Sequence, residues 1–197
     1  MQTIYLFDFD GTVTKGDTLL AIARQHKGSV HLWLWMLLHG PLLVLMKLGV
    51  CSNAAVKERF FRHFFGGMSI LAFNRLCEQF AEKHVNMVRR SALKRISEAN
   101  EQRARVLIVS ASIDNWVMAM MQQFDVNIEV VGTQIEVVDG LLTGRFTTPN
   151  CYGEEKVNRI RALILDREQV KLIAFGDSRG DREMLDYADE AHCKELD

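Results

Sequence analysis

Several features that would assign a protein to a particular class are missing from this sequence of 197 residues. The four cysteines are scattered, without the paired spacing of a zinc site, at Cys51, Cys77, Cys151 and Cys193. We expect them to be reduced thiols of a cytosolic protein. No internal repeat or low-complexity tract occurs. The first residues lead directly into a predicted strand, without a basic segment and an apolar core, so we expect no secretory signal.

An excess of charge of one sign is missing too. The formal net charge is -1 at pH 7, from 24 basic and 25 acidic residues. This balance carries no electrostatic signature of nucleic acid or of an anionic membrane, and we expect no nucleic-acid partner. A composition that is 48% hydrophobic and 25% charged is ordinary for a soluble globular protein. The length allows one sizeable domain, or one domain with a large insertion.

The stretch over residues 4–14, IYLFDFDGTVT, organises the rest of the chain. A short apolar run without alternation predicts a strand buried on both faces of a parallel sheet. Ligands in such sheets bind just beyond the carboxyl ends of the strands, where Asp8 and Asp10 lie. Two carboxylates at that point repel each other unless they share a cation or a proton, and Mg²⁺ prefers hard oxygen ligands. The alternative is an acidic turn, since Asp and Gly are ordinary turn residues.

The second half of the chain alternates between helical and strand patterns. Apolar runs predict buried strands over 105–109, 127–133 and 171–175, and residues 134–148 read as a hairpin. Helices are predicted between the strands, over 86–102, 114–124, 154–165 and 182–188. This alternation predicts an α/β protein with a doubly wound, Rossmann-like parallel sheet.

Residues 15–84 carry no strand pattern and are predicted to form helices. The predicted helix breaks are at glycines, namely Gly28, Gly40-Pro41, Gly49 and Gly66-Gly67. The helix after residue 53 has an aromatic stripe that favours a core, and Arg59 and Arg62 on the same helix could reach an anionic substrate or lie in solvent. We therefore predict a catalytic core formed by residues 1–14 and 85–197, and an inserted helical cap over residues 15–84.

One segment of the cap is unusually apolar. Residues 28–46, GSVHLWLWMLLHGPLLVLM, are nineteen residues without Asp, Glu, Lys or Arg. Their number suits a membrane span, but His31, His39 and Gly40-Pro41 divide them into two shorter arms. Three alternatives stay open: a helix pair packed on the protein, an apolar wall that meets a membrane or a lipid-like substrate, and a true span. We expect a cytoplasmic protein, with membrane association left open by this segment.

Polar residues follow three of the predicted buried strands, and one lysine begins a later helix. They are Asp8, Asp10, Ser110, Lys156, Asp177 and Asp181, and Ala111 beside Ser110 is a further candidate through its backbone N–H. Each alone has an ordinary explanation as a turn, cap or surface residue, but together they form a coherent phosphate site. Phosphate must be neutralised before a carboxylate can approach it. Mg²⁺ and Lys156 supply that charge, while Ser110 and nearby N–H groups hold the nonbridging oxygens.

The chemistry that this set predicts is phosphoryl transfer to an aspartate. Asp8 attacks phosphorus and forms an aspartyl-phosphate. Asp10 protonates the leaving oxygen and then takes a proton from the attacking water. The predicted metal ligands are Asp8, Asp177 and the main-chain carbonyl of Asp10. Asp181 orients Lys156 or a metal-bound water.

The order DFDGT, a strand ending in Ser110, then Lys156, then GDSRGD resembles the haloacid dehalogenase-like superfamily in its phosphatase branch. The resemblance covers nearly the whole chain, and the insertion is similar to the cap of the phosphoserine-phosphatase-like subgroup. It implies Asp8 as nucleophile, Asp10 as acid and base, Ser110 and Lys156 as phosphate holders, and Asp177 as metal ligand. Asp10 also distinguishes the chain from the dehalogenases of the superfamily, which lack this aspartate.

Departures from the subgroup bear on the substrate. Phosphoserine phosphatases have a glutamate where Asp17 stands here, and tend to have asparagine where Gly180 stands. The apolar segment resembles that of phosphatidylglycerophosphate phosphatases, which act on a lipid head group. We therefore expect a phosphate ester of a small molecule or of a lipid, with Asp17, Arg59 and Arg62 as candidates for substrate recognition. The alternatives are a phosphotransferase or mutase on the same core, and a noncatalytic, membrane-associated binding module.

Overall fold

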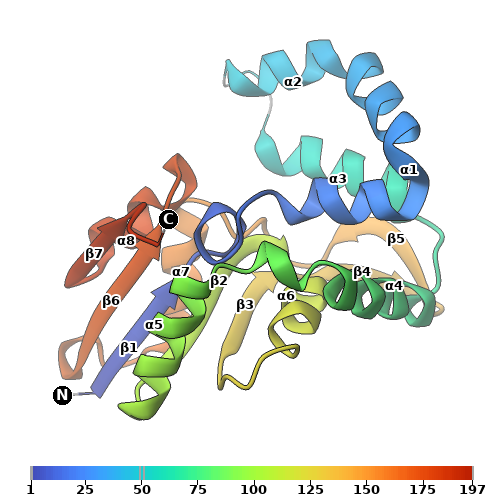
Figure 1. Ribbon diagram of the computed structural model, residues 1–197. Helices are drawn as coiled ribbons and strands as arrows, with labels where there is room; N and C mark the ends of the chain where they lie inside the picture. The colour runs from blue at the N-terminus through green and yellow to red at the C-terminus, as the bar shows by residue number, and fades with distance from the viewer. Residues whose placement is uncertain (1, 49, 51, 197) are drawn as a thin grey trace.

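A five-stranded parallel sheet forms the centre of the protein. The computed structural model describes residues 2–48, 50 and 52–196. The strand order is β3-β2-β1-β6-β7, and every neighbouring pair is parallel (Figure 1). The strands are β1 (Gln2–Phe7), β2 (Arg105–Ile113), β3 (Glu129–Thr133), β6 (Val170–Gly176) and β7 (Glu190–Cys193). Phe7 at the end of β1 is in register with Ile108 and Phe175, so the three central strands end at one edge of the sheet.

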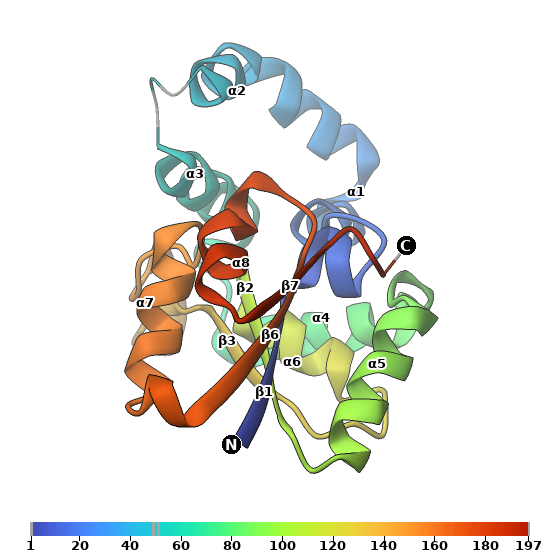
Figure 2. The same ribbon diagram turned by 90° about the vertical axis from the view of Figure 1, so that its left-hand side faces the viewer.

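Helices cover both faces of this sheet, as predicted. Figure 2 shows helices on each side of the sheet. They are α5 (Arg90–Glu101) and α6 (Asp114–Met121) on one face, and α7 (Glu154–Leu163) and α8 (Arg182–Tyr187) on the other. Successive side chains of a strand point to opposite faces, so Tyr5 and Phe7 pack in one hydrophobic cluster, and Ile4 and Leu6 in the other. The doubly wound α/β fold is confirmed.

The structure also corrects the predicted elements. Strand β7 was not predicted, because its four residues form a half-exposed edge strand without an apolar run. Helix α5 begins at Arg90 and not at residue 86. The backbone just before it is extended, because Arg89 N–H donates to Val13 O (2.8 Å) and Thr14 forms a bridge with Val88. This pairing ties the start of α5 to the chain that leaves β1.

The described residues of the inserted segment form four α-helices. They are α1 (Thr18–Leu38), α2 (Gly40–Lys47), α3 (Asn53–Phe65) and α4 (Ile70–Lys83). Three of them begin at a side-chain cap, because Asp17, Ser52 and Ser69 each accept a bond from a backbone N–H in the first turn. The predicted breaks at Gly28 and Gly40 are confirmed: Gly28 has a φ of +84° within α1, and α1 and α2 meet at 64°. The predicted break at Gly49 lies outside the described residues.

A hairpin from the second half of the chain packs on α3. Its strands are β4 (Ile135–Val138) and β5 (Leu141–Phe146), as predicted. The ring of Phe146 lies 5.6 Å from that of Phe61, and Glu58 Oε1 accepts the Phe146 N–H at 2.9 Å. The aromatic stripe of α3, including Phe61 and Phe65, is fully buried, which confirms its prediction as core. The division into a core and a cap over residues 15–84 stays a prediction.

Helix α2 and the second half of α1 project from the rest of the fold, at the top of Figure 1. One side of this part of α1 packs on α3, where Trp35 meets Phe60 with ring centroids 4.7 Å apart. Among the described residues, no single helix has both the length and the apolarity to cross a membrane. Only α1 and α2 together, across their 64° bend, meet that standard by length and composition.

The cysteines form no disulfide in the described part of the chain. Cys77, Cys151 and Cys193 are unpaired, and Cys51 lies outside the described residues. Burial raises the pKa of Cys77 above the usual range and the pKa of Cys151 to about 11. Because these two thiols stay protonated at neutral pH, they are poor metal ligands and poor nucleophiles.

Candidate active site

The turn after β1 starts the site. Asp8 N–H donates to Phe175 O at 2.9 Å, which continues the sheet by one bond past the end of β1. The chain then forms a single wide turn over Phe9–Val13, in which Gly11 has a φ of +87°. A Cβ at Gly11 would collide with the carboxylate of Asp177. Glycine is therefore needed here both for the backbone conformation and for the close approach of Asp177.

A buried lysine holds the carboxylates. Lys156 Nζ donates to Asp8 Oδ1 (2.5 Å), Asp181 Oδ1 (2.6 Å) and Val109 O (2.7 Å), which uses all three of its donors. The Lys156 side chain is 1% exposed, and although burial lowers its pKa, the two carboxylates raise that pKa above the usual range. Burial raises the pKa of Asp8 to about 7, although the Lys156 ammonium opposes this shift. The charges are therefore fixed in place with little water around them.

Both carboxylate oxygens of Asp181 accept hydrogen bonds from other groups of the protein. Its Oδ1 accepts from Lys156, and its Oδ2 accepts from Asp177 N–H (3.3 Å), Ser178 N–H (3.0 Å) and the Ser178 hydroxyl (2.8 Å). Burial acts to raise the pKa of Asp181, but Lys156 and these hydrogen bonds hold it below its usual range. This carboxylate therefore orients both Lys156 and the loop that carries Asp177.

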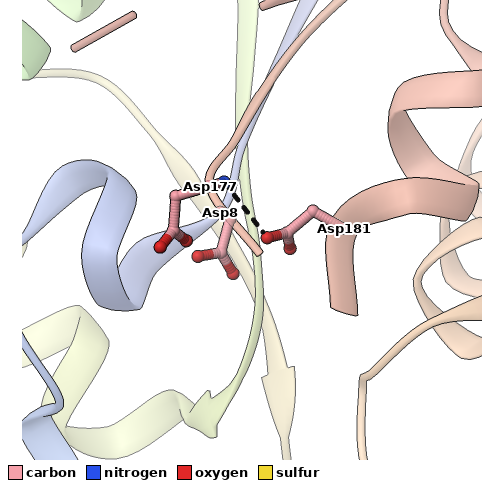
Figure 3. Close-up of side chains that lie close together, drawn as sticks. All are labelled: Asp8, Asp177 and Asp181. Atoms are coloured by element: carbon pink, nitrogen blue, oxygen red, sulfur yellow. Dashed lines mark hydrogen bonds between the residues drawn. The ribbon is translucent and has the colours of Figure 1, made fainter. Parts of the chain in front are cut away.

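Three carboxyl groups face one another at the edge of the sheet. Asp8, Asp177 and Asp181 offer oxygen atoms that lie within 4.8 Å of one another, and Figure 3 shows them turned toward a common centre. Burial and the charge of Asp181 raise the pKa of Asp177, and the Thr12 hydroxyl donates to it at 3.3 Å. Since one ammonium faces three carboxylates, the group favours a divalent cation, and its oxygen donors suit Mg²⁺.

The side chain of Asp10 lies outside this group of three. It accepts from Thr18 N–H (2.8 Å), the Thr18 hydroxyl (2.7 Å) and the Ser112 hydroxyl. Trp116 Nε1 in turn donates to the Thr18 hydroxyl at 3.0 Å. Burial and the charge of Asp17 raise the pKa of Asp10. Thr18 and Ser112 were missed in the sequence, where the only signal was that Ser112 shares a strand face with Ser110.

These residues lie at one end of a cavity of about 650 Å³. The polar end is lined by Asp8, Asp10, Ser110, Ala111, Ser112, Lys156 and Asp181. Side chains of the cap line the other end, mostly apolar ones from α1, α2 and α3: Leu19, Leu20, Trp35, Met36, Leu43, Val44, Met46, Val56 and Phe60. Asp17 also lies in the wall. The structure thus brings most of the phosphate-site candidates and the apolar side chains of residues 19–60 into one cavity, while Asp177 is next to Asp8 but is not part of the cavity lining.

The two arginine candidates do not lie in this cavity. Arg59 and Arg62 line a second cavity of about 500 Å³, together with His39 and His63. The reason is helical geometry, because the face of α3 that is turned to the first cavity carries Val56, Lys57 and Phe60. We therefore leave the two arginines out of the proposed substrate site.

The cation that α3 does place in the first cavity is Lys57, which was missed. Lys57 Nζ donates to Ala111 O and to Asn150 Oδ1 (3.2 Å), next to the predicted phosphate loop. Burial lowers its pKa from 10.5 to about 8. The signal in the sequence was its position three residues before Phe60, on the aromatic face of the helix. A helical segment of the cap thus reaches the core of the site through a charged group.

Comparison with known proteins agrees with this geometry. A family model described as haloacid dehalogenase-like hydrolase matches residues 5–186. The chain belongs to the haloacid dehalogenase-like hydrolase family. This confirms the resemblance found in the motifs. The hydrolase is 28% identical over 187 residues to Protein CicA of Caulobacter vibrioides, an alignment that covers 93% of this chain and 82% of the relative.

Solved structures share the fold of this haloacid dehalogenase-like hydrolase. A protein of unknown function from Bordetella pertussis Tohama I has a TM-score of 0.80 at 18% identity, covering 95% of this chain and 87% of that one. A substrate-bound phosphoserine phosphatase complex has a TM-score of 0.67 at 19% identity, covering 98% and 86%. At this identity the likeness concerns the fold alone.

Proposed function

We propose that this haloacid dehalogenase-like hydrolase is a magnesium-dependent phosphomonoester phosphatase that works through an aspartyl-phosphate on Asp8. The observation that supports this most directly is the placement of Asp8. Its carboxylate lies at the polar end of the cavity, bonded to Lys156 at 2.5 Å and facing Asp177. A carboxylate held this way is fixed in orientation, and the adjacent cationic groups counteract its repulsion of a phosphate.

The residues divide the work of holding phosphate and metal. Asp8, Asp177 and the main-chain carbonyl of Asp10 would hold Mg²⁺, which neutralises the phosphate and the developing charge when bound. Lys156 adds a fixed positive charge. Ser110 Oγ accepts the Ser112 N–H at 3.0 Å, so its own hydroxyl hydrogen is left to donate to a nonbridging phosphate oxygen. Ala111 lies beside Ser110 in the same wall, where its backbone N–H serves the same purpose.

The proposed reaction has two displacements. In the first, a carboxylate oxygen of Asp8 forms a bond to phosphorus, the bond to the ester oxygen breaks, and Asp10 gives that oxygen a proton. In the second, water loses a proton to Asp10 and attacks the same phosphorus, which breaks the bond to Asp8 and releases inorganic phosphate. Thr18 and Ser112 hold Asp10 in the orientation that both steps need. Asp181 positions Lys156 throughout.

The substrate we propose is a phosphomonoester whose alcohol part is apolar or amphiphilic, a small molecule or a lipid head group. The cavity wall opposite the phosphate site is built from Leu, Met, Val, Trp and Phe side chains, which favours an apolar group. Asp17 and Lys57 are the charged cap side chains at this wall, and we assign them to substrate recognition. We also propose a cytoplasmic location with peripheral membrane contact through residues 28–46.

The test is Asp8→Asn, assayed with a chromogenic aryl phosphate and Mg²⁺. We expect turnover to fall by at least about 10³-fold, because the amide is not a nucleophile. Asp166→Asn is the matched control, since Asp166 is exposed and does not line the cavity. Equal hydrolysis by wild type and Asp8→Asn would exclude the proposed nucleophile.

The same assay separates the alternatives. A phosphatase releases inorganic phosphate in water alone, whereas a phosphotransferase or mutase needs an added alcohol as acceptor. A binding module turns over no phosphomonoester, whether aryl, short-chain or long-chain in detergent. Faster turnover of long-chain than of short-chain phosphates at equal Mg²⁺ is the expected result for the apolar wall.

A further inference from the structure

The projecting arm of the cap exposes an apolar surface that the rest of the fold does not cover. We define the apolar arm as Val30–Leu38 of α1, helix α2, Leu48 and Val50. Its exposed large side chains are Val30, Trp33, Leu34, Leu37, Leu38, Val44, Leu45, Leu48 and Val50. Trp33 is 69% exposed, and Leu37 and Leu38 are each 79% exposed. Contiguous apolar surface of this kind marks an interaction site.

The spacing on α1 shows that the exposure is a property of one helix face. Val30, Trp33, Leu34, Leu37 and Leu38 follow the intervals three, four, seven and eight, which place them in one stripe along the helix. The opposite stripe of the same helix packs on α3. A surface helix normally carries polar residues on its outer face. The outer stripe of this arm is apolar instead, and its side chains are exposed, so it has no partner inside the described chain.

The charge of the surrounding sequence indicates what kind of partner fits. Residues 18–50 contain three basic residues, Arg24, Lys27 and Lys47, and no acidic residue, although the whole chain has a net charge of -1. An apolar helical surface within a purely basic segment complements an anionic lipid surface. A tryptophan on the same stripe suits the boundary between head groups and acyl chains.

Resting on the peripheral membrane contact proposed above, we propose that the apolar arm docks this protein on the surface of an anionic lipid bilayer, with α1 and α2 lying in the plane of the interface. The 64° bend between the helices allows both to lie on one surface without crossing it. Val44 links the arm to the active-site cavity, since it lines that cavity and is 56% exposed. Docking therefore places the apolar wall of the cavity next to the lipid.

The experiment is co-sedimentation of the full chain with vesicles that are about one third phosphatidylglycerol in phosphatidylcholine. Wild type binds these vesicles, binding weakens with added salt, and it weakens on pure phosphatidylcholine. Leu37→Gln/Leu38→Gln lowers the apparent affinity by at least about tenfold. Neither leucine lines the cavity, so hydrolysis of a soluble aryl phosphate stays unchanged in this variant.

The matched control is Leu71→Gln/Leu165→Gln, which removes two leucines that are 70% and 89% exposed and lie outside the arm. This variant binds as wild type does. Asp8→Asn also binds as wild type does, which keeps docking separate from catalysis: a failed nucleophile assignment leaves this result intact, and failed docking leaves the hydrolysis result intact.

Three results would overturn the proposal. The first is vesicle binding that is unchanged in Leu37→Gln/Leu38→Gln, or lowered equally in the control variant. The second is equal binding to anionic and neutral vesicles. The third is a wild-type chain that does not bind anionic vesicles. If that chain also forms a dimer by gel filtration, and the dimer is lost in Leu37→Gln/Leu38→Gln, a second copy covers the arm.

Discussion

At the scale of single residues, one buried ammonium holds the site together. Lys156 bonds two carboxylates and one carbonyl, and it is among the largest fully buried side chains. Such a group is costly to desolvate, and removing either partner leaves an unpaired buried charge. These ion pairs therefore contribute little net free energy to folding, but they fix the orientation of the Asp8 carboxylate. Its value lies in preorganisation for charge that develops during reaction.

Lys57 gives a prediction about pH. Burial lowers its pKa from 10.5 to about 8, so between these pH values the unfolded chain binds a proton that the folded protein does not. The free energy of unfolding should therefore rise with pH across this window, by about 1–3 kcal/mol from this residue. Lys57→Met lacks the titrating group and should lose that part of the rise. Urea denaturation at a series of pH values measures it.

The control for this prediction is Lys94→Met, because the Lys94 side chain is 80% exposed. That variant should keep the wild-type dependence on pH. If Lys57→Met shows the same rise as wild type, Lys57 is solvated in solution and is not the cavity cation described above.

At the scale of elements, turns and packed helices decide where the site residues lie. The Phe9–Val13 turn directs Asp10 toward α1, and Asp181 caps the short turn that carries Asp177. Helix α3 brings Lys57 to Ala111 at the end of β2. The β4–β5 hairpin packs on α3 and is bonded to it through Phe146 and Glu58. An element far from the reacting atoms thus sets the position of a charge inside the cavity.

The contact of the hairpin with α3 can be tested at Gly144. Its φ is +83°, and a Cβ there would lie 2.7 Å from the backbone Cα of Arg62. Gly140 in the same hairpin has a φ of +76° and open space around it. Both alanine variants carry the strain of a positive φ, but only Gly144→Ala forces the hairpin off α3. Gly144→Ala should lower the free energy of unfolding by about 1–3 kcal/mol more than Gly140→Ala.

Urea denaturation of the two variants in parallel decides the matter. If both variants lower the free energy of unfolding equally, the hairpin can shift away from α3 without destabilising the fold, and it does not hold α3 in place. An additional rise in KM for the aryl phosphate in Gly144→Ala would connect the hairpin to the cavity through Lys57.

At the scale of the whole molecule, the ends of the sheet strands supply negative charge and helices α1, α2 and α3 supply apolar side chains to one cavity. Three carboxyl groups gather at the ends of strands that are far apart in the sequence. Repulsion among them is a cost that a divalent ion relieves, so ion binding is linked to folding. The apolar wall opposite favours an ester with an apolar group, as proposed above.

Mg²⁺ should therefore stabilise the folded protein in the absence of substrate. Millimolar Mg²⁺ should raise the free energy of unfolding by about 1–3 kcal/mol, which corresponds to a rise of a few degrees in the midpoint of thermal unfolding. EDTA should reverse the change. Asp177→Asn should abolish most of the increase, because it removes one anionic ligand. Asp186→Asn is the control, since Asp186 is exposed and pairs with Arg182. An increase of equal size in both variants would place the ion elsewhere.

The sequence by itself determined four of the five strands of the sheet, the order of the motifs and a set of candidate residues for the phosphate site. Short apolar runs predict buried strands. Polar residues directly after such strands lie at one edge of a parallel sheet, because the carboxyl ends of its strands meet there. The same local logic predicted the helix breaks at Gly28 and Gly40, because glycine disfavours a continuing helix.

Only the tertiary structure decided which side chains of the cap reach the site. Lys57 lies in the cavity and Arg59 and Arg62 do not, because that depends on how α3 is rotated about its axis against the hairpin. Thr18 and Ser112 became visible as partners of Asp10 only after the turn was formed. Strand β7 depends on pairing with β6 and not on its own residues. Local patterns report burial, but contacts between distant segments are set by packing of the whole chain.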